Sequence, residues 1–131
     1  MLPAFNEDGY LPAGAHPAGL DEVEARFGRD SELRRAQMQS LRWLADLVRR
    51  AGMRRFVIDG SFVSDLPEPN DVDCVLLAGA PLTQDLEDEF AAGLPFLQVI
   101  VAEQEDLDYF VNEFFATDRH GVPKGVVEVM L

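Results

Sequence analysis

The chain has one cysteine, few basic residues and no long apolar run, and each shortage excludes a class of protein. With Cys74 as the only thiol, the 131 residues cannot form an internal disulfide. No run approaches the roughly 18 apolar residues that a membrane-spanning helix needs. The N-terminus lacks a basic segment followed by an apolar one, so no signal peptide is expected. The sequence therefore predicts a cytoplasmic protein with no membrane partner.

Basic residues are scarce: 11 lysines and arginines face 24 acidic residues, which gives a net charge of −13. Affinity for nucleic acid comes largely from Lys and Arg on phosphates, so this balance argues against nonspecific binding of DNA or RNA. An acidic chain of this size could instead bind a basic protein partner. Seven arginines are expected to be solvated or paired with carboxylates, or in a few cases to face a phosphate. They are Arg34, Arg35, Arg42, Arg49, Arg50, Arg54 and Arg55.

Hydrophobic periodicity and turn residues divide the chain into an irregular arm, residues 1–19, and a single domain, residues 20–131. Helices are expected at 20–27, from a cap at Asp30 or Ser31 to 51, at 83–92 and at 106–115. Strands are expected at 54–59, 72–77, 96–102 and 126–131. This alternation predicts the α/β (α+β) class, a sheet of about four strands with helices packed on it.

Residues 54–77, RRFVIDGSFVSDLPEPNDVDCVLL, hold the candidate site. They form two expected strands, with a Gly60-Ser61 turn after the first and a nine-residue polar loop before Asp71. Side chains alternate along a strand, so Asp71 and Asp73 point the same way, while Cys74 points into the core. Neighbouring carboxylates repel each other unless something positive lies between them. The pattern therefore indicates a divalent cation such as Mg²⁺ or Mn²⁺.

The order apolar-Gly60-Ser61, spacer, Asp71-Val72-Asp73 resembles the signature of the nucleotidyltransferase superfamily, the DNA polymerase beta-like fold. The segments DGSFVSDLPEPNDVD and DRHGVPKG also resemble a small branch of that superfamily in bacteria and phages. The resemblance covers residues 11–131 and implies a mixed sheet. It also implies metal-dependent transfer of a nucleoside monophosphate from a nucleoside triphosphate (NTP) to a protein, RNA or small-molecule acceptor. Related minimal forms serve in toxin–antitoxin and phage-defence systems.

The residues fit that chemistry. Two cations held by Asp71 and Asp73 would lower the pKa of the attacking hydroxyl and hold the triphosphate. Gly60 lets the backbone approach a phosphate, and Ser61 can donate its hydroxyl and backbone N–H. Arg119 and Lys124 could reach the β- or γ-phosphate, or form an exposed turn.

The superfamily implies a third carboxylate on a neighbouring strand, and two residues are candidates. Glu128 lies inside an apolar strand and is favoured over Glu103, which follows one; the alternative is that Glu128 faces water at a sheet edge. Asp59 could support the metal ligands from behind or belong to the turn. The predicted catalytic and metal-binding set is therefore Asp71, Asp73 and Glu128.

A second hypothesis keeps the fold without the reaction. The short spacer and the acidic surface also fit a catalytically inactive interaction module that binds a protein partner. The chain has no evident second domain to hold an acceptor, so the enzyme hypothesis predicts a large partner or a homodimer.

Overall fold

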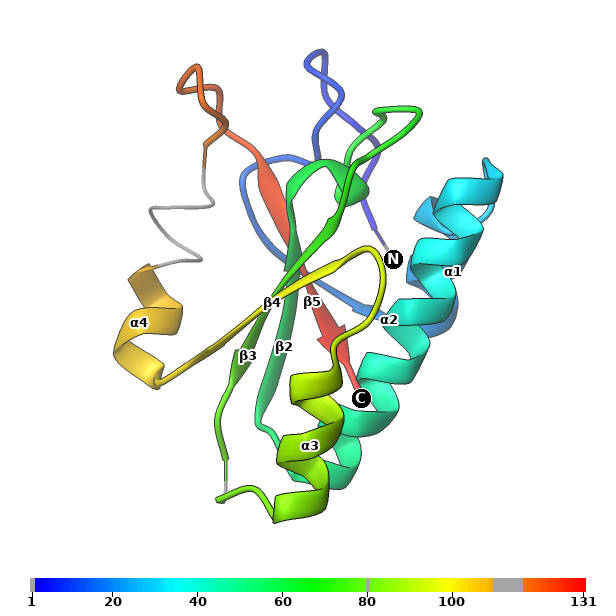
Figure 1. Cartoon of the computed structure of the whole chain (residues 1–131). Helices are drawn as coiled ribbons and strands as arrows, with labels where there is room; N and C mark the ends of the chain where they lie inside the picture. The colour runs from blue at the N-terminus through cyan, green and yellow to red at the C-terminus, as the bar shows by residue number, and fades with distance from the viewer. Residues whose placement is uncertain (1, 80, 110–116) are drawn as a thin grey trace.

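The computed structural model describes residues 2–79, 81–109 and 117–131, and builds them around one mixed five-stranded sheet (Figure 1). The strand order is β1-β5-β2-β3-β4. The outer pairs β1–β5 and β3–β4 are parallel, and the inner pairs β5–β2 and β2–β3 are antiparallel. The strands are β1 (Gly14–Gly19), β2 (Arg55–Asp59), β3 (Val72–Leu77), β4 (Leu97–Ala102) and β5 (Gly125–Met130).

The helices mostly follow the predicted boundaries because their capping residues are strong. Ser31 accepts a hydrogen bond from the Arg34 N–H at the start of the long helix, and Gly52 ends that helix in a left-handed conformation. Thr83 caps the next helix in the same way as Ser31. The helices are α1 (Leu20–Phe27), α2 (Glu32–Ala51), α3 (Gln84–Ala92) and α4 (Gln104–Tyr109). Among the described residues, no helix is long and apolar enough to cross a bilayer.

Two predictions about the elements need correction. The arm was expected to be irregular, yet β1 occupies its last six residues as an edge strand beside β5. An edge position tolerates Pro17 because one side of the strand needs no ladder hydrogen bonds. The sheet consequently has five strands rather than about four. The last predicted helix begins two residues early, at Gln104, and residues 110–115 of that prediction lie outside the described part of the chain.

The two faces of the sheet have different roles. One face packs its apolar side chains with those of α1 and α2 into the main core, which includes Phe56, Ile58, Cys74 and Leu76. The opposite face carries a smaller apolar cluster and, at one end, two aspartates. That cluster consists of Val57, Val75, Leu77, Ala102 and Val126. Cys74 is buried on the main-core face, as the alternation predicted.

Arg34 is a buried structural residue, which corrects the expectation that it is solvated, paired with a carboxylate or facing a phosphate. The residue is 3% exposed, and its guanidinium donates to four backbone carbonyl oxygens at 2.6–3.0 Å. Burial lowers its pKa. The acceptors are the carbonyls of Phe27, Phe62, Ser64 and Leu66. Arg34 therefore ties helix α2 to the loop that follows Gly60-Ser61.

Candidate functional site

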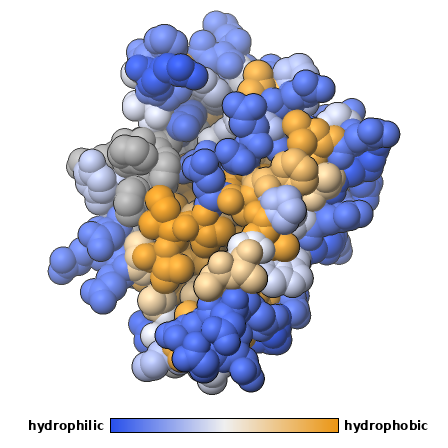
Figure 2. Space-filling view, in the orientation of Figure 1, coloured by the Kyte–Doolittle hydropathy of each residue, from blue (hydrophilic) through white to orange (hydrophobic). Residues whose placement is uncertain are grey.

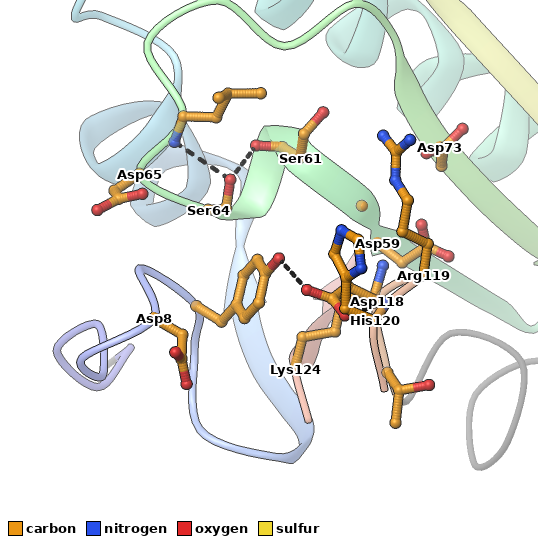
Figure 3. Close-up of a pocket in the computed structure, with 14 residues that line it drawn as sticks. Asp8, Asp59, Ser61, Ser64, Asp65, Asp73, Asp118, Arg119, His120 and Lys124 are labelled. Atoms are coloured by element: carbon orange, nitrogen blue, oxygen red, sulfur yellow. Dashed lines mark hydrogen bonds between the residues drawn. The ribbon is translucent and has the colours of Figure 1, made fainter. Parts of the chain in front are cut away.

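A pocket of about 770 Å³ lies at the end of the sheet where β2 stops and β3 and β5 begin. The antiparallel pairings of β2 with β3 and with β5 bring these three strand ends together. Three segments form its walls: the turn after β2, the loop before β1, and the turn before β5 (Figure 3). The lining residues are Asp8, Tyr10, Asp59, Gly60, Ser61, Ser64, Asp65, Leu66, Asp73, Thr117, Asp118, Arg119, His120 and Lys124.

The predicted Gly-Ser turn forms the floor of this pocket. Residues Gly60–Val63 make one 3-10 turn, labelled η1, and Gly60 has φ +78°, which favours glycine. A side-chain carbon at Gly60 would also displace the Asp73 carboxylate. The Ser64 hydroxyl donates to the Ser61 carbonyl oxygen at 2.6 Å and fixes the turn. Both Gly60 and Ser61 therefore lie where the sequence predicted, beside the aspartates.

Asp59 and Asp73 face each other across β2 and β3 as directly paired residues. Asp59 is 1% exposed, and neither of its carboxylate oxygens has a hydrogen-bond partner among the described residues. Burial and then the Asp73 carboxylate raise the pKa of Asp59 to about 7, while Lys124 opposes the shift. Burial and then Asp71 also raise the pKa of Asp73, and Lys124 again opposes. The pocket thus holds two adjacent carboxylates whose charge is poorly compensated.

Asp71 stands just outside this pair. Its side chain is half-buried and accepts a hydrogen bond from the Gln98 amide at 3.2 Å. Gln98 pairs with Asp73 in the β3–β4 register, so Asp71 and Asp73 lie on the same face of the sheet, as the alternation predicted. Asp71 does not line the pocket, but it is close enough to affect Asp73 electrostatically.

The structure does not bring Glu128 into the pocket. It pairs with Val57 on β2, about 6.7 Å further along the strand than the Asp59 level. The Arg55 guanidinium contacts both of its carboxylate oxygens, with one donor–acceptor distance of 2.9 Å, and the Glu128 carboxylate raises the pKa of Arg55. Glu103 follows the end of β4 that pairs with Leu77, which is the end remote from Asp73. Among the described residues, no group of three or more Asp, Glu, His or Cys side chains could hold a metal ion.

The turn before β5 supplies the positive charge of the pocket. The Asp118 carboxylate accepts from the His120 and Val122 N–H groups and also from the Tyr10 hydroxyl at 2.7 Å, so the turn and the N-terminal loop hold each other. Arg119 and Lys124, for which the sequence left open a phosphate contact or an exposed turn, both line the pocket, and Arg119 is exposed (Figure 3). Lys124 acts electrostatically on both Asp59 and Asp73. The pocket therefore sets two cationic side chains against a carboxylate pair.

Sequence reasoning assigned to the site only five of the residues that line this pocket. The lining residues that it missed are Asp8, Tyr10, Asp59, Ser64, Asp65, Leu66, Thr117, Asp118 and His120. Asp59 was expected to support the metal ligands or to belong to the turn, and the structure places it directly opposite Asp73. Tyr10 and Asp8 come from the arm, which carried no site signal. A carboxylate at the end of an apolar strand, immediately before a glycine, was the one available signal for Asp59.

Fold and pocket together define a mixed α/β protein with a carboxylate pair at the bottom of a partly cationic pocket. The model of a family of unknown function (DUF6932) matches residues 3–130, and the chain belongs to that family. No curated protein matches the chain. No solved structure matches it either.

Proposed function

We propose that the pocket binds the triphosphate of an NTP through a divalent cation, and that the chain transfers the nucleoside monophosphate to an acceptor oxygen. The observation that carries the proposal is the Asp59–Asp73 pair in the pocket lining, in which buried Asp59 has no hydrogen-bond partner among the described residues. Both carboxylates line a space that also contains Gly60, Ser61 and Lys124, and Lys124 acts on them electrostatically without a hydrogen bond to Asp59. Hard oxygen ligands of this kind suit Mg²⁺ or Mn²⁺.

The charge balance of the pocket favours an anionic ligand that binds together with a cation. Carboxylates outnumber the cationic side chains in the lining, so a bare triphosphate would be repelled. Asp59 and Asp73 would hold a divalent cation, whose chemistry would be to offset the negative charge of the phosphates. Lys124 and Arg119 would then contact phosphate oxygens from the opposite wall.

The transfer needs few groups beyond these. The acceptor oxygen bonds to the α-phosphorus, the bond from that phosphorus to the bridging oxygen breaks, and pyrophosphate leaves with the electron pair. The acceptor proton passes to a pocket carboxylate or to water. Gly60 and Ser61 line the pocket and would offer backbone N–H groups and a hydroxyl to the phosphates. The acceptor class and a toxin–antitoxin or phage-defence setting stay predictions of the sequence resemblance.

Calorimetric titration of ATP, GTP, CTP and UTP with Mg²⁺ tests the binding step. We expect at least one NTP to bind only with the cation, and Asp73→Asn to weaken that binding by more than about tenfold, because it removes a charged ligand. Asp88→Asn is the matched control, since this exposed aspartate lies on α3, away from the pocket (Figure 1). Absence of binding by any of the four, or equal binding by Asp73→Asn, would contradict the proposal.

Labelled substrates test the transfer step. With an NTP labelled at the α-phosphate, the wild type should pass the label to an acceptor in a cell extract. The Asp73→Asn variant should not transfer it. A label at the γ-phosphate should stay in pyrophosphate. Transfer of the γ-label would instead indicate a kinase reaction.

A second candidate function, a protein-binding module, is favoured by strand β4. This edge strand exposes Val99, Ile100 and Val101 by 38–50% and contains neither proline nor a charged residue, the usual protections of an exposed edge. Figure 2 shows an apolar patch over the part of the surface that β4 crosses, with hydrophilic residues around it. Because exposed Glu103, Glu105 and Asp106 follow the strand, the partner we infer is an extended segment that alternates apolar and basic residues.

A synthetic alternating Val/Lys peptide provides the probe for this surface. We expect it to bind the wild type, Val101→Lys to abolish binding through charge repulsion, and Val101→Thr to retain most of it. Fluorescence anisotropy with a labelled peptide measures all three. Failure of the wild type to bind the peptide would refute this candidate, and a concentration-dependent dimer mass would assign β4 to a second copy of the chain instead.

A further inference from the structure

The pocket is more acidic than the proposed function requires. Five aspartates line it against one arginine and one lysine, and the proposed divalent cation would engage only two of them. The other three, Asp8, Asp65 and Asp118, lie around Tyr10 and are named the acidic rim. The hydrogen bond to Asp118 raises the pKa of Tyr10 most, and burial and the charges of all three rim carboxylates raise it further. The acidic rim therefore gathers negative charge at one place in the pocket.

Backbone contacts fix the acidic rim in place. Tyr10 and Ser64 form an isolated antiparallel bridge, and the Asp65 N–H donates to the Gly9 carbonyl oxygen at 2.9 Å. Gly9 has φ +78°, and a side-chain carbon there would displace the Asp65 carboxylate, because the N-terminal loop lies directly against it. The Asp118 carboxylate accepts a hydrogen bond from the Tyr10 hydroxyl at 2.7 Å. The acidic rim is thus built from three segments that hold one another.

The acidic rim carries charge that the described residues do not neutralise. Asp8 and Asp65 are exposed, and neither carboxylate has a salt bridge or a hydrogen bond within the described part of the chain. Arg34 acts on Asp65 electrostatically, but its guanidinium donates to four carbonyl oxygens. Asp59, in the same lining, is 1% exposed and has no partner there for either oxygen. Because buried polar groups are nearly always partnered, this carboxylate independently indicates that a positively charged ligand completes the pocket.

The placement of the carboxylates selects the kind of cation. Figure 3 shows Asp8 and Asp65 on one side of the pocket, and Asp59 and Asp73 on the other. Across the described ranges, no group of three Asp, Glu, His or Cys side chains could hold a metal ion. A metal ion at Asp59 and Asp73 would therefore leave the acidic rim uncompensated. An extended molecule with positive charges at intervals would instead be attracted to both groups of carboxylates.

Apolar side chains in the lining narrow the choice further. Leu66 is 46% exposed although its backbone is fixed: its N–H donates to the Ser64 hydroxyl, and its carbonyl oxygen accepts from Arg34. Tyr10 adds an aromatic ring to the lining, and aromatic rings attract organic ammonium groups. An inorganic ion gains nothing from apolar contacts, whereas a polyamine alternates ammonium groups with methylene segments that do. The pocket volume of about 770 Å³ also lies within the range of small-molecule sites, about 300–1,000 Å³.

We infer that the pocket binds a linear polyamine, with its ammonium groups at the acidic rim and its methylene groups against Tyr10 and Leu66. The inference goes beyond the proposed function and does not depend on it, because that function assigns no role to the acidic rim. A lysine side chain of a protein offers the same ammonium group. We assign the free polyamine because the carboxylates line a pocket of small-molecule size.

Calorimetric titration of spermidine at neutral pH and about 0.15 M salt tests the site without NTP or metal. We expect one saturable site on the wild type, and a loss of more than about tenfold in affinity for Asp8→Asn/Asp65→Asn, because two charged partners are removed. The matched control is Asp85→Asn/Asp88→Asn, which changes the net charge equally on exposed residues of α3. This control should bind spermidine as the wild type does.

A second pair of variants tests the apolar contact. Leu66→Ser should weaken spermidine binding by about fivefold, because the methylene groups lose an apolar partner. Leu131→Ser should leave the binding unchanged, since Leu131 is 49% exposed but lies outside the pocket lining. Unchanged binding by Leu66→Ser would show that the ligand is not held along its methylene segments, which contradicts the inference.

The remaining outcomes separate this inference from nonspecific attraction and from the proposed function. Equal losses in the two double variants, or no saturable binding by the wild type, would overturn it. Tighter binding of an acetylated trilysine peptide, which carries the same three positive charges as spermidine, would overturn it in favour of a basic protein segment. Spermidine binding without NTP binding would keep this site and remove the nucleotide proposal, and the reverse result would do the opposite. Circular dichroism confirms that each variant is folded.

Discussion

Replacing Arg34 with methionine is expected to lower the free energy of unfolding by at least about 3 kcal/mol, the first of the two largest effects predicted for this chain. The guanidinium donates to four carbonyl oxygens that no other side chain is shown to satisfy. Methionine fills a similar volume but leaves the buried carbonyl oxygens of Phe27, Phe62 and Ser64 without the guanidinium, and an unsatisfied buried acceptor costs about 1–3 kcal/mol. Urea denaturation followed by circular dichroism measures the change.

The neighbouring arginine provides the matched control. Arg35 is exposed and makes one side-chain hydrogen bond to the Arg29 carbonyl oxygen, so Arg35→Met should change stability by less than about 0.5 kcal/mol. Arg34→Lys keeps the charge but cannot reach four acceptors with a planar fork, and its stability should lie between the other two. Similar losses for Arg34→Met and Arg35→Met would contradict the structural role assigned to Arg34.

Most helices and strands could be predicted because their signals are local. Ser31, Gly52 and Thr83 mark helix ends through capping chemistry that acts within a few residues. Strand β1 could not be predicted in this way, since it is stabilised by pairing with β5, more than 100 residues later. Within the predicted long helix, the buried role of Arg34 also depends on distant carbonyls, although its place four residues before Met38 on the apolar face was a usable signal.

The candidate site was predicted only in part, and there is a physical reason why the rest could not be predicted. Alternation along one strand correctly placed Asp73 on the pocket face and Cys74 in the core. Which residue faces Asp73 depends on the register between β2 and β3, which a nine-residue loop does not specify. For the same reason the sequence could not show that Arg55 holds Glu128 from the adjacent strand.

The second large effect is a pH dependence that Asp59→Asn should remove. An aspartate in an unfolded chain has a pKa of about 3.9, whereas burial and Asp73 raise the pKa of Asp59 to about 7. The folded state therefore holds the Asp59 proton more tightly than the unfolded state. The stabilising contribution of this group is fully present below pH ~4 and is lost as the pH rises through ~7.

The size of the loss follows from the shift. A difference of about three pKa units corresponds to about 4 kcal/mol, an upper bound because Asp73 and Lys124 share the effect. Without divalent cations, Asp59→Asn should thus be the more stable protein at pH 8, and the two curves should converge toward pH 4.5. Urea denaturation between pH 4.5 and 8.5, with a chelator present, measures the free energy of unfolding of the wild type and of Asp59→Asn. Parallel curves across this range would show that Asp59 is not the titrating group.

Mg²⁺ should offset the destabilising charge of Asp59 and Asp73 at pH 8. An ion that binds only the folded state adds stability that grows with its concentration, so it should stabilise the wild type at pH 8 and leave Asp59→Asn nearly unchanged. The order of the two proteins would then narrow or reverse as Mg²⁺ is added. An ionised carboxylate that destabilises the cation-free protein, and whose cost is offset when a cation binds, is expected at a functional site. If Mg²⁺ leaves the stability of the wild type unchanged at pH 8, the Asp59–Asp73 pair does not bind the cation, and strand β4 becomes the surface to investigate.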